Sequence, residues 1–434
     1  MRKRLSRRQI ERGKTVLLVL LLVLALFLGG EAGIFGTFLN LAAPSEAAAP
    51  TGALSSPDGE QSPDSTAAAP FVMAVTWGDG ARFGAKYGAA QPLFERFSTL
   101  LGEALGSSGE PKEASALQWK TALSGEGVFF DYLYSQPLAV LADCLGTQIG
   151  EQSGNYGVRQ LCIHAEGGAL ALYYIDADGG KIYRCDTALR ESALGGMEGL
   201  SPNGARFAFE DPGEYREISA YTLLLSDAPS LTALRAENPL QGSLRPEEVL
   251  NAFGFNSFVA TSYPAGNGAV VYVQGGRTLR IDPDGLLSFQ GDGEVLRLGD
   301  NLSLGALTKA VGDFAARSAG KWAGAAGLRL CGSSADAGAE RGEFQFNYVY
   351  DNIPIAGGGS AVAVTVTDGA VTQVRMRLRG YALSGGDDLL PLPEKQAVAA
   401  VEAEGGGEPV LVYEDAGGSP AELTAQWYRA VPGE

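Results

Sequence analysis

The side chains best suited to catalysis are few in this chain and stand far apart. Its single histidine, His164, lies between Ile163 and Ala165 in an apolar stretch, so a catalytic triad or a histidine-based metal site would depend on that one residue. Ser318 to Lys321 has the S-x-x-K spacing of serine–lysine enzymes but lacks their S-D-N and K-T-G companions. We therefore expect His164 to be structural, and we expect no enzyme activity, no resident cofactor and no metal site.

Acidic and aromatic residues form two further candidate sites. Asp387 and Asp388 stand next to each other in a glycine-rich loop, where a solvated turn is the expected role. Aromatic side chains also alternate along one face of a predicted strand, and they are Phe344, Phe346, Tyr348 and Tyr350. Such a face suits a recognition surface, but a sheet face packed on a helix is the simpler interpretation.

The four cysteines, Cys144, Cys162, Cys185 and Cys331, are too widely spaced to suggest a zinc site. Cys162 and Cys185 fall in neighbouring predicted strands, so a disulfide between them is one interpretation for an exported protein. The other interpretation is that the cysteines are small apolar core residues.

The charge is distributed unevenly along the chain. The first 14 residues hold seven basic residues and one acid, and the whole chain carries a formal −17, so the other 420 residues carry −23. A body this acidic repels polyanions, and no basic stripe with interleaved aromatics occurs. We therefore expect no nucleic-acid partner.

An apolar segment follows the basic leader. Thr15 to Gly30 contains no charge, and only Glu31 separates it from a second apolar piece, Ala32 to Leu39. Basic residues stay on the cytoplasmic side, which predicts a single-pass membrane protein with a cytoplasmic N-terminus and an extracytoplasmic body. The alternative is a cleaved signal peptide, for which Ala47 to Ala49 would supply the small residues.

Composition and turn signals divide the chain into six parts. Residues 42–70 are almost all Ala, Pro, Ser, Gly and acids and cannot bury a core, which is typical of a flexible linker. The predicted parts are a basic leader over 1–14, a transmembrane anchor over 15–39, the linker over 40–70, a first extracytoplasmic α+β domain over 71–238, and helix-plus-meander lobes over 239–300 and 301–434.

The body shows the patterns of an α+β fold, with helices packed on antiparallel β-meanders. Helical spacing or a proline start predicts helices over 93–105, 111–123, 246–253, 304–314 and 393–401. Turn residues between apolar runs predict hairpins at Asp176–Gly180, Gly275–Gly276, Pro283–Gly285 and Asp368–Gly369. Helix followed by meander occurs twice, which suggests two related lobes.

Several stretches resemble the YycH family, membrane-anchored regulators associated with the WalK/WalR two-component system of low-GC Gram-positive bacteria. They are ERGKTVLLVLLLVLALFLGG from residue 11, WKTALSGEGVFFDYLYSQPLAVLADCLG from residue 119, VLNAFGFN with YVQGGRTLRIDPDGLLSF, and FQFNYVYDNIPIAGGGSAVAVTVTDGAVTQV. The related YycI proteins share the order of helix and meander. The long Ala/Pro linker, the four cysteines and the glycine- and alanine-rich loops depart from the family.

The resemblance implies a non-enzymatic regulator that contacts a sensor histidine kinase, often together with a YycI-like partner. It also implies that the anchor helix packs beside the kinase helices. Small residues favour close packing of helices in lipid, and those available are Ala25, Gly29, Gly30 and Gly33. The other interpretation is that these small residues only mark the end of the anchor, where large apolar side chains become fewer.

Two other classes of function stay open. The body would suit a PepSY-like extracytoplasmic module that binds a ligand or inhibits a peptidase, and a large apolar pocket with converging polar groups would favour it. It would also suit a cell-envelope hydrolase with a carboxylate site. Loss of activity on changing one buried acid, without loss of the fold, would favour that class.

Overall fold

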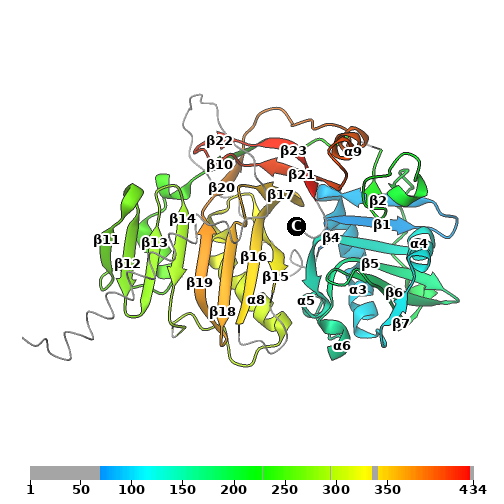
Figure 1. Cartoon of the computed structure of the whole chain (residues 1–434), viewed down its shortest axis with the longest axis horizontal. Helices are drawn as coiled ribbons and strands as arrows, with labels where there is room; N and C mark the ends of the chain where they lie inside the picture. The colour runs from blue at the N-terminus through cyan, green and yellow to red at the C-terminus, as the bar shows by residue number, and fades with distance from the viewer. Residues whose placement is uncertain (1–68, 227, 294, 335–340, 431–434) are drawn as a thin grey trace, which may run out of the picture. The chain divides into compact units, whose positions relative to one another are not determined.

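The computed structural model describes residues 69–430, apart from 227, 294 and 335–340 (Figure 1). It forms an α+β fold with antiparallel meanders, as the sequence predicts. The predicted leader, the anchor and nearly all of the linker lie outside the described residues, as do Ala25, Gly29, Gly30 and Gly33. Among residues 69–430 as described, no helix combines the length and apolar character needed to cross a membrane.

The first sheet is antiparallel and has the strand order β2-β1-β4-β5-β6-β7-β3. Its strands are β1 Val72–Thr76, β2 Arg82–Lys86, β3 Lys112–Ala114, β4 Gly127–Pro137, β5 Gly157–Glu166, β6 Ala169–Asp176 and β7 Ile182–Arg190. Successive residues of β4 face opposite sides. Phe130 packs with α3 (Ala90–Gly106) on one face, and Phe129 packs with α4 (Ala116–Ser124) on the other.

The start of α4 differs from the prediction. Pro111 was expected to open this helix, but Lys112–Ala114 instead forms strand β3, which pairs with β7. The helix begins after Ser115, whose hydroxyl accepts a hydrogen bond from the Gln118 amide while the Gln118 side chain accepts one from the Ser115 amide. This reciprocal cap satisfies the free amides of the first turn, so it defines the helix start more strongly than proline does.

The second sheet has the order β11-β12-β13-β14-β19-β18-β16-β17-β21-β23, with β15 also paired to β16. Its strands are β11 Thr261–Pro264, β12 Val270–Gln274, β13 Arg277–Ile281, β14 Leu286–Gln290, β15 Gly327–Ser333, β16 Arg341–Tyr350, β17 Ile353–Ala356, β18 Val362–Thr367, β19 Ala370–Arg377, β21 Glu408–Glu414 and β23 Thr424–Ala430. The remaining α-helices of the described chain are α5 Leu138–Cys144, α6 Glu151–Gly154, α7 Pro246–Ala252, α8 Leu304–Ser318 and α9 Glu394–Ala403.

The two predicted meanders belong to this one sheet. Figure 1 shows β11 to β14 continuing into β19 and β18, and the junction is the antiparallel pairing of β14 with β19, in which Leu287 lies opposite Met376. The residues on both sides of the predicted boundary at 300 therefore share a sheet. The predicted hairpin connections at 275–276, 283–285 and 368–369 are confirmed by the registers of β12–β13, β13–β14 and β18–β19.

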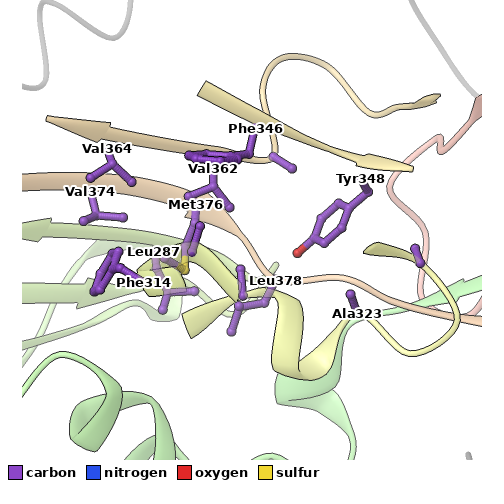
Figure 2. Packing of buried hydrophobic residues seen from close by; sticks show 14 of the residues in the cluster. Leu287, Phe314, Ala323, Phe346, Tyr348, Val362, Val364, Val374, Met376 and Leu378 are labelled. Carbon is purple, nitrogen blue, oxygen red and sulfur yellow. The ribbon is translucent and has the colours of Figure 1, made fainter. Parts of the chain in front are cut away.

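The main core lies between the second sheet and helices α7 and α8. Phe344, Phe346 and Tyr348 of β16 are buried there together with Phe314 of α8, and Tyr350 is partly buried against the same core. Figure 2 shows Phe314 close to Leu287 and Met376, and Phe346 above Val362. The aromatic face of β16 is therefore core and not a recognition surface.

Two smaller sheets complete the body. β10 (Leu234–Glu237) pairs with β20 (Gly380–Leu383) and β22 (Ala421–Glu422), while β8 (Arg206–Phe207) pairs with β9 (Leu223–Leu224). Next to β20, the buried guanidinium of Arg379 donates two hydrogen bonds to Asp415, at 2.7 and 2.6 Å. The bidentate geometry compensates both buried charges. It therefore fixes the loop after β21, which carries Asp415, to the core.

Candidate functional site

The residues with catalytic potential have structural roles. Nδ1 of His164 lies 3.1 Å from the carbonyl oxygen of Glu126, and its ring packs near Tyr173. The buried hydroxyl of Ser318 donates to the carbonyl oxygen of Phe314 at 2.7 Å, while Lys321 is exposed and its ammonium lies over the Trp322 ring. Ser318 and Lys321 therefore do not form a serine–lysine pair.

The paired acids lie at the surface. Asp387 and Asp388 are exposed, and Asp388 accepts a hydrogen bond of 3.0 Å from the Ser230 hydroxyl. Among the described residues, no cluster of three or more His, Cys, Asp or Glu side chains could hold a metal ion.

Cys162 and Cys185 are free thiols and do not form the disulfide considered above. Strand β6 separates their strands, and the two side chains belong to cores on opposite faces of the first sheet. Burial raises the pKa of Cys162 to about 12 and that of Cys185 to about 11. Both thiols are therefore protonated at neutral pH and serve as apolar core residues.

The most exposed large apolar side chain of the described residues is that of Phe258, in the turn between α7 and β11. Phe258 is 99% exposed, Val259 is 64% exposed, and Tyr263 on β11 is 54% exposed. Exposed apolar side chains that lie together, rather than singly, are a common mark of an interaction site. We call Phe258, Val259 and Tyr263 the apolar edge.

Asn256 holds this turn in a defined shape. Its side-chain oxygen accepts a hydrogen bond from the Phe258 amide at 3.0 Å, and its carbonyl oxygen accepts bonds from Val259 and Ala260. The Asn256 amide in turn donates to the Gln274 side chain at 2.8 Å. Phe258 is therefore presented on an ordered turn rather than on a loose loop.

The apolar edge adjoins an unpaired strand. β11 is the terminal strand of the second sheet, all four of its residues are exposed, and within the described residues it pairs only with β12. Residues 249–281 contain two arginines and no acid, although the body as a whole is strongly acidic. An exposed strand edge with apolar neighbours and little charge is suited to contact with another chain.

A shallow groove with a volume of about 280 Å³ lies elsewhere on the surface. It lies between α9 and β23, and its lining includes Leu392, Val401, Trp427 and Arg429. The indole N–H of Trp427 donates to the Leu392 carbonyl oxygen at 2.9 Å, which fixes one wall. Small-molecule sites are usually enclosed clefts of about 300–1,000 Å³, so this groove lies just below their size.

Partly buried ion pairs join the first sheet to the C-terminal part. Arg159 of β5 bonds Asp131 of β4 at 2.8 Å and Glu408 of β21 at 2.6 Å. Burial opposes ionisation of Asp131, but the charge of Arg159 and the hydrogen bonds to this carboxylate outweigh it, so its pKa lies below the ordinary value. The three charges thus stabilise the contact between the two sheets.

Sequence reasoning did not identify the apolar edge. The stretch Phe253 to Tyr263 lacks the regular spacing of a helix or a strand, so neither periodicity marks which of its apolar residues face water. The only local signal is the Asn256–Ser257 pair after Gly254, which is typical of a turn. An apolar residue inside a turn is the feature that would have drawn attention to Phe258.

No family model and no curated protein sequence matches the chain. Among solved structures, the fold is similar to the crystal structure of YycH from Bacillus subtilis, with a TM-score of 0.54, 12% sequence identity, and coverage of 85% of this chain and 95% of that chain. The crystal structure of an uncharacterized protein from Eubacterium rectale has a TM-score of 0.33, with 10% identity over 49% of this chain and 82% of that chain. The similarity to YycH is one of fold.

Proposed function

We propose that the protein is a membrane-anchored regulator of a sensor histidine kinase and is not an enzyme. The observation that carries the proposal is the YycH-like fold, which extends over most of the described body. The YycH-like stretches of sequence support the same function. The anchor predicted over 15–39 would hold the body at the outer face of the membrane, beside a kinase in the same bilayer.

Two parts of the chain would contact the kinase. In the membrane, the small residues Ala25, Gly29, Gly30 and Gly33 would allow close packing of the anchor against kinase helices. Outside the membrane, the apolar edge would bind an apolar face of the kinase or of a YycI-like partner. Burying Phe258 alone removes a large aromatic surface from water, which makes it a candidate hot spot.

The first experiment is a cross-linked pull-down from membranes with the full chain. We expect it to capture a histidine kinase, and we expect a chain whose segment 15–39 is replaced by an unrelated polyleucine anchor to capture less. If neither chain captures a kinase, the proposed function is wrong.

A pair of surface variants tests the extracytoplasmic contact. Phe258→Ser removes the most exposed apolar side chain, and Leu117→Ser is the matched control, since Leu117 is 75% exposed on α4. We expect Phe258→Ser to reduce capture and Leu117→Ser to leave it unchanged. Equal capture by both variants would mean that the apolar edge does not contact the kinase.

The ligand-binding alternative has one observation in its favour, the groove between α9 and β23. Its aromatic and cationic lining, Trp427 and Arg429, would suit a small anionic or peptide ligand. Its limited volume makes it the weaker proposal. Screening the body against dipeptides by calorimetry, with Trp427→Ala as control, would support this function only if binding were lost in the variant.

A further inference from the structure

The described chain begins with three buried residues. Ala69 and Pro70 are the last two residues of the predicted linker and Phe71 follows it, yet Ala69 is fully buried and Phe71 is only 5% exposed. The first residues of a domain are usually loosely held unless specific contacts tie them down. The contacts that hold Ala69–Phe71 come from both sheets.

The first sheet contributes contacts from β4. The Phe71 amide donates a hydrogen bond to the carbonyl oxygen of Asp131 at 2.8 Å. The Phe71 ring meets the Tyr134 ring edge to face, with centroids 5.8 Å apart. These contacts continue the pairing of β1 with β4 by one residue toward the linker.

The second sheet contributes contacts from β15 and from the turn between β16 and β17. The Asn352 side-chain amide donates to the carbonyl oxygens of Pro70 and Phe71, at 3.1 and 3.2 Å. The Arg329 guanidinium lies 4.3 Å from the centroid of the Phe71 ring and donates to the Asn352 side-chain oxygen at 2.7 Å. Arg329 and Asn352 are both buried, so these contacts are shielded from water.

The backbone of the β16–β17 turn explains why the amide of Asn352 is so well placed. Asp351 and Asn352 form a two-residue hairpin connection, with φ of 49° and 59°. Both values lie in the left-handed region, which asparagine and aspartate tolerate better than most residues. The turn therefore directs the Asn352 amide at the start of the body without depending on a flexible loop.

We propose that Ala69–Phe71 forms a latch held jointly by the two sheets, so that a movement between β4 and β15 loosens the point where the body joins its linker. The inference rests on the proposed function, because only a chain with an anchor gives the linker something to act on. A kinase that shifts one sheet relative to the other would thereby change how the anchor is held. Arg329 suits such a role because its buried guanidinium contacts the neutral amide of Asn352 and the aromatic ring of Phe71.

The latch is tested by hydrogen exchange of the full chain in detergent micelles, read at the Phe71 amide and, as a reference, at the Leu172 amide in β6. Asn352→Gly removes the second-sheet contact and keeps the left-handed turn. Tyr134→Leu removes the ring contact with the first sheet and keeps the backbone hydrogen bond from Phe71 to Asp131. The matched control is Asn267→Gly, because Asn267 has a φ of 60° in a turn before β12.

We expect both latch variants to speed exchange at Phe71 by about tenfold or more, with Leu172 and the control unchanged. Unchanged exchange at Phe71 in Asn352→Gly would overturn the proposal, because the segment would then belong to the first sheet alone. An equal increase at Leu172 would also overturn it, because the contacts would then serve only global stability. The measurement needs no kinase, so a failed kinase capture and a failed latch are distinguishable.

Discussion

Lys86 and Glu394 form a buried ion pair although 308 residues separate them in the chain. Lys86 ends β2, Glu394 begins α9, and their side chains are only 8% and 2% exposed. The second carboxylate oxygen of Glu394 accepts a hydrogen bond from the Leu225 amide at 2.9 Å. The pair therefore ties the first sheet to the C-terminal helix, and the position of Glu394 in the first helical turn suits its negative charge.

Replacing Lys86 should destabilise the body strongly. Lys86→Met leaves the Glu394 carboxylate buried without its cation, which costs about 3–5 kcal/mol in the free energy of unfolding. Urea denaturation measures this change. The control is Lys112→Met, whose partner Asp186 and whose own side chain are both more than half exposed, so about 1 kcal/mol or less is expected. Equal losses in the two variants would contradict the prediction.

Asp131 should make the body sensitive to acid. Its pKa is lower in the folded state than in the unfolded chain, so its contribution to stability is present above its ordinary value of 3.8 and is lost as pH falls through the folded value. We expect Asp131→Asn to be less stable than the natural chain at pH 7 and the difference to shrink below about pH 4. Urea midpoints at a series of pH values measure it, and a constant difference would contradict it.

Tyr134 should contribute to loss of stability in alkali. Burial raises its pKa from 10.0 to about 12, so its contribution is fully present below pH 10 and is lost as pH rises toward 12. Tyr134→Phe keeps a ring against Phe71 but cannot ionise. We expect the variant to lose less stability than the natural chain between these pH values, by roughly 1–2 kcal/mol after allowing for partial exposure. Urea denaturation at pH 10 and at pH 12 measures this difference. An equal loss of stability in the variant and the natural chain would show that Tyr134 does not cause it.

A single carbon added at Gly88 should destabilise the body. A Cβ at this position would lie 2.1 Å from the carboxylate oxygen Oδ1 of Asp351, far inside normal contact distance. Gly88→Ala should therefore lower the unfolding free energy by about 1–3 kcal/mol. Asp351→Gly, which keeps the left-handed turn, should relieve most of that loss in the double variant. Simple addition of the two single effects would show that the residues do not clash.

Phe258 should contribute little to folding. Because its side chain is 99% exposed, we expect Phe258→Ser to change the free energy of unfolding by about 0.5 kcal/mol or less. Phe253, five residues earlier, is fully buried, and Phe253→Ala should cost about 3–5 kcal/mol. Thermal and urea denaturation compare the two. A large loss in Phe258→Ser would mean that the apolar edge serves the fold rather than a partner.

Local patterns of the sequence predicted much of the secondary structure. The turn residues Gly275–Gly276 and Asp368–Gly369 are adjacent in the chain, so their signals do not depend on tertiary context. The alternating aromatics of β16 likewise predicted a buried face. The start of α4 was missed because the side-chain cap of Ser115 outweighed the proline signal at Pro111.

Tertiary structure alone decided which elements meet. Three long-range contacts depend on how much apolar surface distant segments bury together, which no short stretch of sequence shows. They are the pairing of β14 with β19, the parallel pairing of β17 with β21, and the ion pair of Lys86 with Glu394. The same holds for Cys162 and Cys185: the strands predicted to be neighbours are separated by β6, and the two side chains lie on opposite faces of the sheet. The sequence by itself thus determined the α+β class and most of its turns, whereas the exposure of Phe258 and the two-sided hold on Phe71 follow only from how the sheets pack.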